Sequence, residues 1–413
     1  MSTGQAALLF FGGLLPLTLM AYSFGRRRAV ALAGEAHLHS RPGYYGWYAV
    51  VWLALPAIAV AVGASLLHMT NLATVPESMV LAAALAVAGG GLWMAARTLR
   101  PGLKARNIVE GVVRWLLIGA SLVSILTTLG IIGSILFEAI RFFQLVSVWE
   151  FLTGTTWSPD TAFLGGAGRG AEGQAEAEFG SVPLFAGTFM ITAIAMLVAL
   201  PVGLLSAIYM SEYAPPKVRE AAKPTLEVLA GIPTVVYGFF AAITVSPLVV
   251  DLAESVGLDA SYSNALAPGL VMGVMIIPFV SSLSDDVISA IPNSLREGSF
   301  ALGATESETI KHVLVPAALP GIVAAFILAI SRALGETMIV VMAAGLRPNL
   351  TANPLEDMTT VTVRIVDALT GDQEFDSPET LSAFGLGLML FIVTLVLNTI
   401  SLMVVRRFHE KYD

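Results

Sequence analysis

The segment from Asp285 to Ile322, DDVISAIPNSLREGSFALGATESETIKHVLVPAALPGI, lies between two long apolar runs and contains the signals that decide the fold. Polar and charged side chains fill its first half, so this half is predicted to lie outside the hydrocarbon layer of a membrane. Asn293 is a favourable first residue for a short helix that ends near Leu302. Gly303 is expected to stop this helix, because glycine readily takes the left-handed conformation found at many helix ends.

A second short helix is predicted directly after this glycine. Thr305 and Glu308 match a capping box, in which each side chain bonds a backbone N–H of the other residue. Pro316 is expected to end the helix and to let the chain turn into the next apolar run. Residues 285–316, called the bracket below, are therefore predicted to form two short helices at a membrane surface. Such a bracket is either a passive connector or a contact site for a partner.

The composition indicates an integral membrane protein. Of the 413 residues, 56% are hydrophobic and only 13% are charged, with a mean hydropathy of +0.79, whereas about 25% of residues are charged in soluble proteins. The chain has no cysteine, and its five histidines show no metal-ligand spacing, so no disulfide and no metal site are expected. The net charge of −8 disfavours nucleic-acid binding, which needs clustered Lys and Arg.

Nine apolar runs have about the 20 residues that cross a bilayer as a helix. The predicted spans are approximately 5–23, 44–67, 78–96, 115–137, 184–209, 228–250, 265–284, 317–343 and 381–405. We therefore expect an all-α integral membrane protein with about nine transmembrane helices. The basic connector RTLRPGLKARN separates three spans from the other six. The predicted domains are an N-terminal three-helix membrane extension (1–96), a basic cytoplasmic linker (97–109) and the main transmembrane domain (110–413).

The distribution of Lys and Arg indicates orientation, because cytoplasmic loops retain these residues. With the N-terminus outside and the C-terminal RRFHEKYD in the cytoplasm, 17 of the 22 Lys and Arg lie on the cytoplasmic side. The five exceptions are Arg141, Arg169, Arg332, Arg347 and Arg364. Asp285 and Asp286 are expected in water at the inner end of their span. The outer segments 138–182 and 346–380 are interpreted as solvated loops, with a docking surface for an external partner as the alternative.

The bracket resembles a known coupling element. Its sequence from Glu297 to Pro316 is similar to the EAA loop of ABC importer permeases, whose pattern is E-A-A, three residues, G, nine residues and I-x-L-P. Gly and Ser replace the two alanines here, and two valines replace Ile and Leu. In this family the loop is a coupling helix that sits in a groove on the ATP-binding subunit. The resemblance therefore assigns ATPase coupling to Glu297, Gly298, Ser299, Gly303 and Pro316.

Four further motifs narrow the resemblance. They are AIYMSEYAPP (207–216), LAGIPTVVYGFF (229–240), IIPFVSSLSDDV (276–287) and ALGETM (333–338). Together with the bracket they look like the phosphate-specific ABC permeases of the PstC type, over approximately residues 110–413. The resemblance implies a six-helix type I ABC importer core, preceded by the three-helix extension, in the bacterial cytoplasmic (inner) membrane.

The resemblance also implies partners and a cargo. The partners are a second permease subunit (PstA type), a cytoplasmic dimer of ATP-binding subunits (PstB type) and an extracytoplasmic phosphate-binding protein (PstS type), and the cargo is inorganic phosphate. The chain has no GxxxxGK[ST] phosphate loop. ATP and Mg²⁺ are therefore expected on the partner ATPase, and this chain is expected to have no catalytic residue and no bound cofactor.

Two charges interrupt a predicted membrane span. In SRALGETMIVVMAAG (331–345), Arg332 is expected near the middle of the span and Glu336 one helical turn further on, about 6 Å along the axis. The two residues are either an intrahelical pair that fixes packing or part of a substrate pathway, as ionisable residues inside membranes often are. The planar guanidinium of Arg332 can bind two phosphate oxygens at once, while Glu336 holds it in position. The resemblance implies this pathway role for both residues.

The sequence thus predicts a permease subunit of an ATP-driven inorganic phosphate importer that works by alternating access. One alternative is an ABC permease for another oxyanion, such as sulfate, molybdate or phosphonate. Another is an intramembrane enzyme that uses Arg332 and Glu336, although neither a nucleophile nor a metal ligand accompanies them in the sequence. A purely structural scaffold would leave the two charges in the span unexplained.

Overall fold

The computed structural model describes residues 3–33, 37–70, 76–159, 177–370 and 376–408. Within these ranges, nine helices are long and apolar enough to cross a membrane, and each overlaps one predicted span. The prediction of an all-α membrane protein with nine spans is confirmed. The chain divides into two compact units, Met1–Gly130 and Ile131–Asp413, and the division falls inside helix α4 (Ala105–Leu145).

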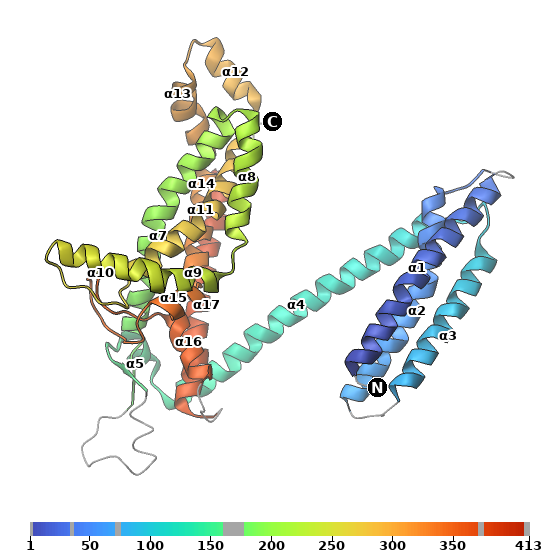
Figure 1. Ribbon diagram of the computed structural model, residues 1–413, viewed down its shortest axis with the longest axis horizontal. Helices are drawn as coiled ribbons and strands as arrows, with labels where there is room; N and C mark the ends of the chain where they lie inside the picture. Colours follow the sequence, from blue (N-terminus) through green and yellow to red (C-terminus); the bar gives the residue numbers. More distant parts are fainter. Residues whose placement is uncertain (1–2, 34–36, 71–75, 160–176, 371–375, 409–413) are drawn as a thin grey trace. The chain divides into compact units, whose positions relative to one another are not determined.

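Three helices pack together in the first unit (Figure 1). They are α1 (Thr3–Ala33), α2 (Pro42–Met69) and α3 (Glu77–Thr98). At Gly91 of α3 the backbones approach so closely that a Cβ there would lie 1.9 Å from the carbonyl oxygen of Trp52 in α2. Small residues permit such close packing of membrane helices. The buried Tyr45 donates from its hydroxyl to the carbonyl oxygen of Pro101 at 2.9 Å, which ties α2 to the connector after α3.

The second unit begins within α4 and contains all the remaining elements. They are α5 (Val148–Thr153), β1 (Trp157–Ser158), β2 (Glu178–Phe179), α7 (Val182–Ile208), η1 (Tyr209–Tyr213), α8 (Pro216–Ala230), α9 (Thr234–Phe240), η2 (Ala241–Val245), α10 (Ser246–Ser255), α11 (Leu266–Ser289), α12 (Asn293–Ala301), α13 (Glu306–Thr309), η3 (Ile310–Leu314), α14 (Val315–Leu334), α15 (Met338–Ala343), α16 (Val361–Thr370) and α17 (Pro378–Phe408). The three η elements are π-helical turns. Strands β1 and β2 pair antiparallel, with Trp157 opposite Phe179.

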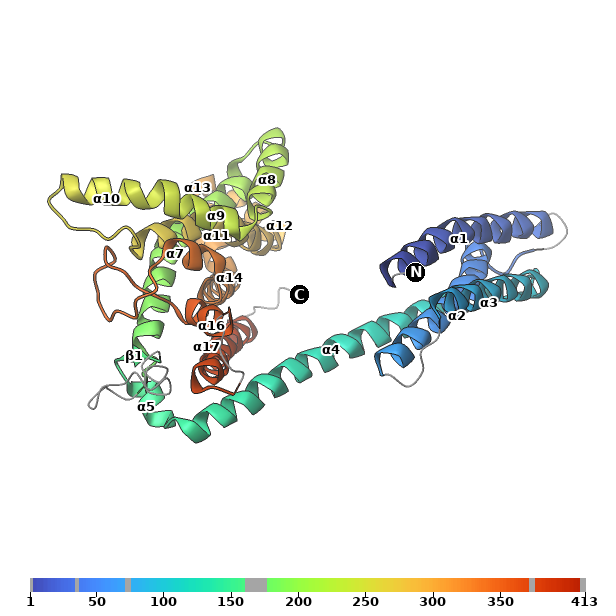
Figure 2. The ribbon, with the colours of Figure 1, turned by 60° about the horizontal axis from the view of Figure 1, so that its bottom comes forward.

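Helices α7, α11 and α14 pack against one another in the second unit, and α17 packs on α14 (Figures 1 and 2). Two glycines of α11 allow α7 to approach closely. A Cβ at Gly273 would lie 2.9 Å from the carbonyl oxygen of Ala195, and one at Gly269 would lie 2.7 Å from the side chain of Ile194. As a result α11 is the most enclosed of the nine long helices, and it is the helix on which a buried site can be built.

The predicted bracket forms at one end of these helices (Figure 1). α12 begins at Asn293 and ends one residue earlier than expected, at Ala301. Gly303 has a φ of 86°, the left-handed conformation that stops the helix. Thr305 and Glu308 form both hydrogen bonds of the capping box at the start of α13. The predicted first helix, its stop at Gly303 and the capping box at Thr305 are confirmed.

The prediction that Pro316 ends the second helix is wrong. α13 continues through η3 into α14, so the chain is helical from Glu306 to Leu334. A proline normally disturbs a helix because it lacks an N–H and its ring clashes with the carbonyl four residues earlier. The wider π-helical turn at Ile310–Leu314 lies directly before Pro316 and gives the ring room.

The span predicted at 228–250 is divided in the structure. α8 ends at Ala230, and the apolar span begins at Thr234 and runs to Ser255. Pro233 lies between them and disfavours a helical conformation of the residue before it. α8 packs against α11 but contains no buried residue, and its Arg219 and Lys223 contact Asp285 of α11. Parts of both predicted outer loops and the last residues of the predicted cytoplasmic C-terminus lie outside the described residues.

Candidate functional site

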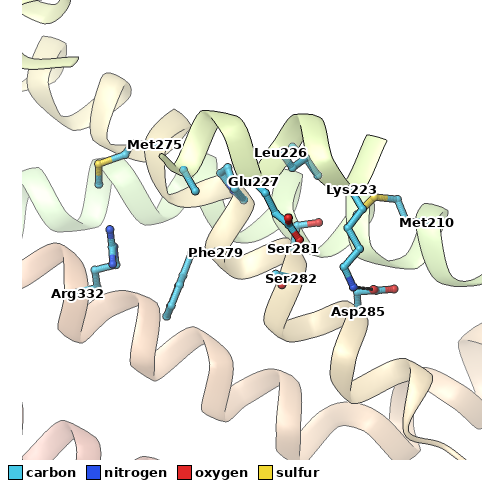
Figure 3. A pocket seen from close by; sticks show the side chains of 12 residues that line it. Met210, Lys223, Leu226, Glu227, Met275, Phe279, Ser281, Ser282, Asp285 and Arg332 are labelled. Atoms are coloured by element: carbon cyan, nitrogen blue, oxygen red, sulfur yellow. Dashed lines mark hydrogen bonds and ion pairs between the residues drawn. The ribbon is translucent and has the colours of Figure 1, made fainter. Parts of the chain in front are cut away.

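A cavity of about 280 Å³ lies between α8, α11 and α14 (Figure 3). Apolar side chains such as Leu226 and Met275 form much of its wall. Its polar lining residues are Lys223 and Glu227 from α8, Ser281, Ser282 and Asp285 from α11, and Arg332 from α14. An apolar cavity with a few converging polar groups is the usual form of a small-molecule site. Two of these groups are cations and two are carboxylates, so an anionic ligand would bind at the cation that has no carboxylate partner.

Arg332 lies in the last turn of α14, with an exposed side chain at one side of this cavity. Its guanidinium carbon lies 5.5 Å from the centre of the Phe279 ring, within the range of a cation–π interaction. Among the described residues, no carboxylate lies within salt-bridge distance of Arg332. The five N–H donors of its guanidinium are therefore available to an anion that enters the cavity.

The predicted pairing of Arg332 with Glu336 on one continuous helix is wrong. α14 ends at Leu334, and Gly335 and Glu336 lie in the break before α15. The Glu336 carboxylate accepts hydrogen bonds from the backbone N–H groups of Met338 at 3.1 Å and Ile339 at 3.4 Å. It thus satisfies unpaired donors at the start of α15, as helix-capping side chains do. Arg332 is consequently at a helix end rather than near the middle of a span.

Asp285 is buried, although the sequence placed it in water. Its side chain is only 2% exposed, and it accepts hydrogen bonds from Arg219 and Lys223 of α8. Both partners lie more than 60 residues away along the chain, so no local pattern could reveal them. The neighbouring Asp286 is 66% exposed, as expected. One sequence feature could have indicated the burial of Asp285. Arg219 and Lys223 are four residues apart and lie on one face of α8, where both can contact a single acidic residue of another helix.

The predicted coupling residues lie on the bracket. Glu297 and Gly298 are exposed on α12, and no atom of the described chain would contact a Cβ at Gly298. The Ser299 hydroxyl lies 2.9 Å from the Thr309 hydroxyl and joins α12 to α13. No residue of α12 is buried. The structure thus brings Ser299 to the second helix and leaves Glu297 and Gly298 exposed.

A salt bridge that the sequence did not indicate anchors α12. Arg296 donates from Nη2 to Glu212 Oε1 at 2.7 Å and from Nε to Oε2 at 3.3 Å. Glu212 belongs to η1, which continues α7. The same guanidinium donates to the carbonyl oxygens of Ile288 and Ile291 at the end of α11. One side chain therefore joins α12 to η1, which continues α7, and to the end of α11.

Two family models match the chain. The model described as "Binding-protein-dependent transport system inner membrane component" matches residues 199–413, just over half of the chain. The chain belongs to this family. The model described as "Phosphate ATP-binding cassette transporter" matches residues 13–77, within the predicted N-terminal extension. Among solved structures, a bacterial ABC transporter involved in alginate import covers 74% of this chain and 100% of that chain, at 17% identity and a TM-score of 0.49.

The curated relatives include several permeases named PstC. The phosphate transport system permease protein PstC 1 of Mycobacterium bovis is 32% identical over 318 residues, 71% of this chain and 92% of the relative. The PstC protein of Mesorhizobium japonicum is 30% identical over 268 residues, 61% of this chain and 77% of the relative. The probable ABC transporter permease YqgH of Bacillus subtilis is 35% identical over 249 residues, 60% of this chain and 75% of the relative. The predicted resemblance to PstC-type permeases is confirmed.

Family membership makes the chain a multi-pass membrane permease and a transport subunit of an ABC system. Permeases of this family work with an ATPase and with a substrate-binding protein. The pathway role of Arg332 and Glu336 and the coupling role of the bracket residues stay predictions.

Proposed function

We propose that this chain is the permease subunit of an ATP-driven inorganic phosphate importer and forms its translocation path with a second permease subunit. The observation that carries the proposal is the cavity at Arg332, which is lined by a guanidinium that has no carboxylate partner among the described residues. A guanidinium can donate two parallel hydrogen bonds to a tetrahedral oxyanion. The relatives named as phosphate permeases support phosphate as the cargo.

Coupling to ATP hydrolysis takes place through the bracket. The exposed α12 docks in a groove of the ATP-binding subunit, and the Arg296–Glu212 salt bridge transmits its movement to α7. Closure of the ATP-bound ATPase dimer opens the path to the outside, and hydrolysis returns it to the cytoplasmic side. ATP and Mg²⁺ bind to the ATPase, and this chain provides the path rather than the chemistry.

The proposed assembly has four kinds of subunit. A PstA-type permease completes the path, a PstB-type dimer hydrolyses ATP, and a PstS-type protein delivers phosphate at the outer face. The N-terminus lies outside and the C-terminus in the cytoplasm of the bacterial inner membrane. The distribution of Lys and Arg supports this orientation, since it places most of them on the side of the bracket.

The charges around the cavity suit passage rather than permanent capture. Arg332 and Lys223 attract an anion, while Glu227 and Asp285 balance their two positive charges. A path conducts only when its binding sites are strong enough to fill and weak enough to empty. The apolar parts of the lining also strengthen electrostatic attraction by excluding water.

Uptake of labelled phosphate tests the proposal. Bacterial cells without their own high-affinity phosphate uptake receive this chain with its neighbouring subunits, and uptake is measured at low external phosphate. A matched strain carries the ATPase with an inactivated ATP site. We expect uptake that depends on the active ATPase and is blocked by unlabelled phosphate but not by sulfate, molybdate or a phosphonate. Uptake without ATPase activity contradicts the ABC importer, and stronger competition by another oxyanion contradicts phosphate as the cargo.

A further inference from the structure

The cavity contains a second cation, Lys223, whose nearest partner is a buried carboxylate. Lys223 Nζ lies 3.1 Å from Oδ2 of the buried Asp285. Arg219, one turn earlier on α8, donates from Nη2 to both oxygens of the same carboxylate, at 3.0 and 3.1 Å. Two cations thus share the Asp285 carboxylate, and Lys223 also lies 3.8 Å from the exposed carboxylate of Asp286.

Lys223 is free to change partner. Arg219 alone reaches both carboxylate oxygens, so Asp285 keeps a cation when Lys223 leaves. The Lys223 side chain is 39% exposed and lines the cavity. Lysine has three rotatable donors on a flexible four-carbon stem and can turn from one anion to another. Arg219 does not line the cavity and has no such choice.

An unpaired hydroxyl lies one turn from Asp285. Ser281 is fully buried on α11 and lines the cavity, and its Oγ has no hydrogen-bond partner among the described residues. Buried polar groups are normally hydrogen-bonded, so such an atom points to a ligand. Residues four apart on a helix lie on the same face. Ser281 and the Asp285–Lys223 pair therefore border on the same part of the cavity.

The two cations of the cavity lie at different depths. Figure 3 shows Arg332 at one side of the cavity and Lys223 with Asp285 at the other. Arg332 lies about 26 Å along α14 from Val315, the first residue of that helix, which lies at the end of the bracket. Asp285 lies one turn before the end of α11 and is the first residue of the bracket. Lys223 is therefore nearer to the bracket than Arg332 is.

We propose that Lys223 and Ser281 form a second binding station for the transported oxyanion, and that Asp285 takes Lys223 back when the anion leaves. The inference rests on the proposed phosphate transport and adds residues to its path. An anion held by Arg332 moves toward the bracket. There Lys223 leaves Asp285 and donates a hydrogen bond to the anion. Return of Lys223 to Asp285 weakens the second station. Two exchangeable sites in series let a cargo move on where one strong site would retain it.

Protection of a single cysteine tests the second station. The chain has no cysteine, so a Ser282→Cys variant carries one label site in the wall of the same cavity. The whole purified complex reacts with 2-aminoethyl methanethiosulfonate at increasing concentrations of inorganic phosphate, and labelling is measured on this chain after the subunits are separated. We expect phosphate to slow labelling. In Lys223→Gln, half-protection should need roughly tenfold more phosphate, since a charge-assisted contact is lost, whereas Lys223→Arg should keep most of the protection.

Two further variants complete the test. Lys217→Gln removes an exposed charge from the same helix, away from the cavity, and should leave protection unchanged. Asp285→Asn removes the competitor for Lys223 and should lower the half-protecting phosphate concentration. Equal protection in Lys223→Gln and in the parent would refute the second binding station. Unchanged or weaker protection in Asp285→Asn would refute it as well. If the parent imports another oxyanion and not phosphate, the cargo assignment fails separately, and the same variants probed with that oxyanion decide the station.

Discussion

The guanidinium of Arg296 in α12 lies 2.7 Å from the carboxylate of Glu212 in η1. The two side chains are only 18% and 12% exposed, so the pair is shielded from water and from salt. Arg296 also donates to two carbonyl oxygens at the end of α11. A force on α12 therefore reaches η1 and the end of α11 through Arg296, next to Leu295, which packs against the apolar cluster that contains Ile288. This is the mechanical link that a coupling helix needs.

Loss of this salt bridge should separate ATP hydrolysis from transport. We expect Arg296→Gln and Glu212→Gln each to reduce phosphate uptake per ATP hydrolysed by about tenfold or more, since breaking a shielded pair leaves an uncompensated charge. The double variant should be no worse than either single variant, because the two residues act as one unit. Uptake and ATPase activity are measured together in proteoliposomes. Lys311→Gln, an exposed cation of the bracket, is the matched control. Additive losses in the double variant would contradict the link.

Glu336 caps α15, so exchanging the charges of Arg332 and Glu336 should have a different effect from the one expected if the two residues formed an ion pair. A double exchange, Arg332→Glu with Glu336→Arg, should not restore uptake, because the two residues have separate partners. Glu336→Gln keeps an oxygen that can accept from the backbone and should retain more uptake than Glu336→Ala. Loss of a capping side chain typically costs about 1 kcal/mol. Rescue of uptake by the double exchange would show that the residues pair during transport.

The two glycines of the coupling pattern should respond differently to substitution. Gly303 has a φ of 86°, whereas Gly298 lies in α12, and a Cβ at either position meets no atom within 4 Å. Gly303→Val should impair coupling strongly, and Gly303→Asn much less, because Asn tolerates the left-handed conformation. Gly298→Ala should preserve uptake and stabilise α12 by about 1 kcal/mol. The readout is uptake per ATP hydrolysed. Equal effects of the Val and Asn variants at Gly303 would refute the conformational explanation.

Close packing of α2 and α3 gives a stability prediction for the first unit. Gly91→Ala places a Cβ against the backbone oxygen of Trp52 and should cost roughly 1–3 kcal/mol of stability through overpacking. Gly90→Ala meets no atom within 4 Å and should be neutral or stabilising. Thermal unfolding of the full chain, followed by tryptophan fluorescence, compares the two, since Trp52 and Trp93 lie in these helices. An equal change in both variants would contradict the close approach.

Local signals in the sequence predicted the elements, and distant contacts escaped prediction. The nine spans follow from the length and hydropathy of the apolar runs, and the capping box at Thr305 depends on residues only three apart. The break at Gly335 was missed because a single glycine is compatible with a continuous helical pattern. At Pro316 the π-helical turn η3 replaced the expected helix end, and nothing in the apolar pattern distinguishes the two outcomes.

The same limit applies to the candidate site. Arg332 was identified from the sequence because a charged residue inside an apolar run is costly to place in a membrane and usually has a function. The burial of Asp285 depends on Arg219 and Lys223, which α8 brings to α11 from more than 60 residues away. Only folding places these three charges together. The Arg296–Glu212 pair spans 84 residues and was missed for the same reason.

Phosphate uptake by Arg332 variants tests the central claim most directly. Parent, Arg332→Gln and Arg332→Lys complexes are compared in proteoliposomes at equal membrane levels, with ATPase activity as the second readout. We expect Arg332→Gln to lower uptake by at least about tenfold while ATP hydrolysis continues, and Arg332→Lys to recover only part of it, because lysine cannot donate the bidentate pair. Normal uptake by Arg332→Gln would show that the cavity arginine is structural and that phosphate takes another path.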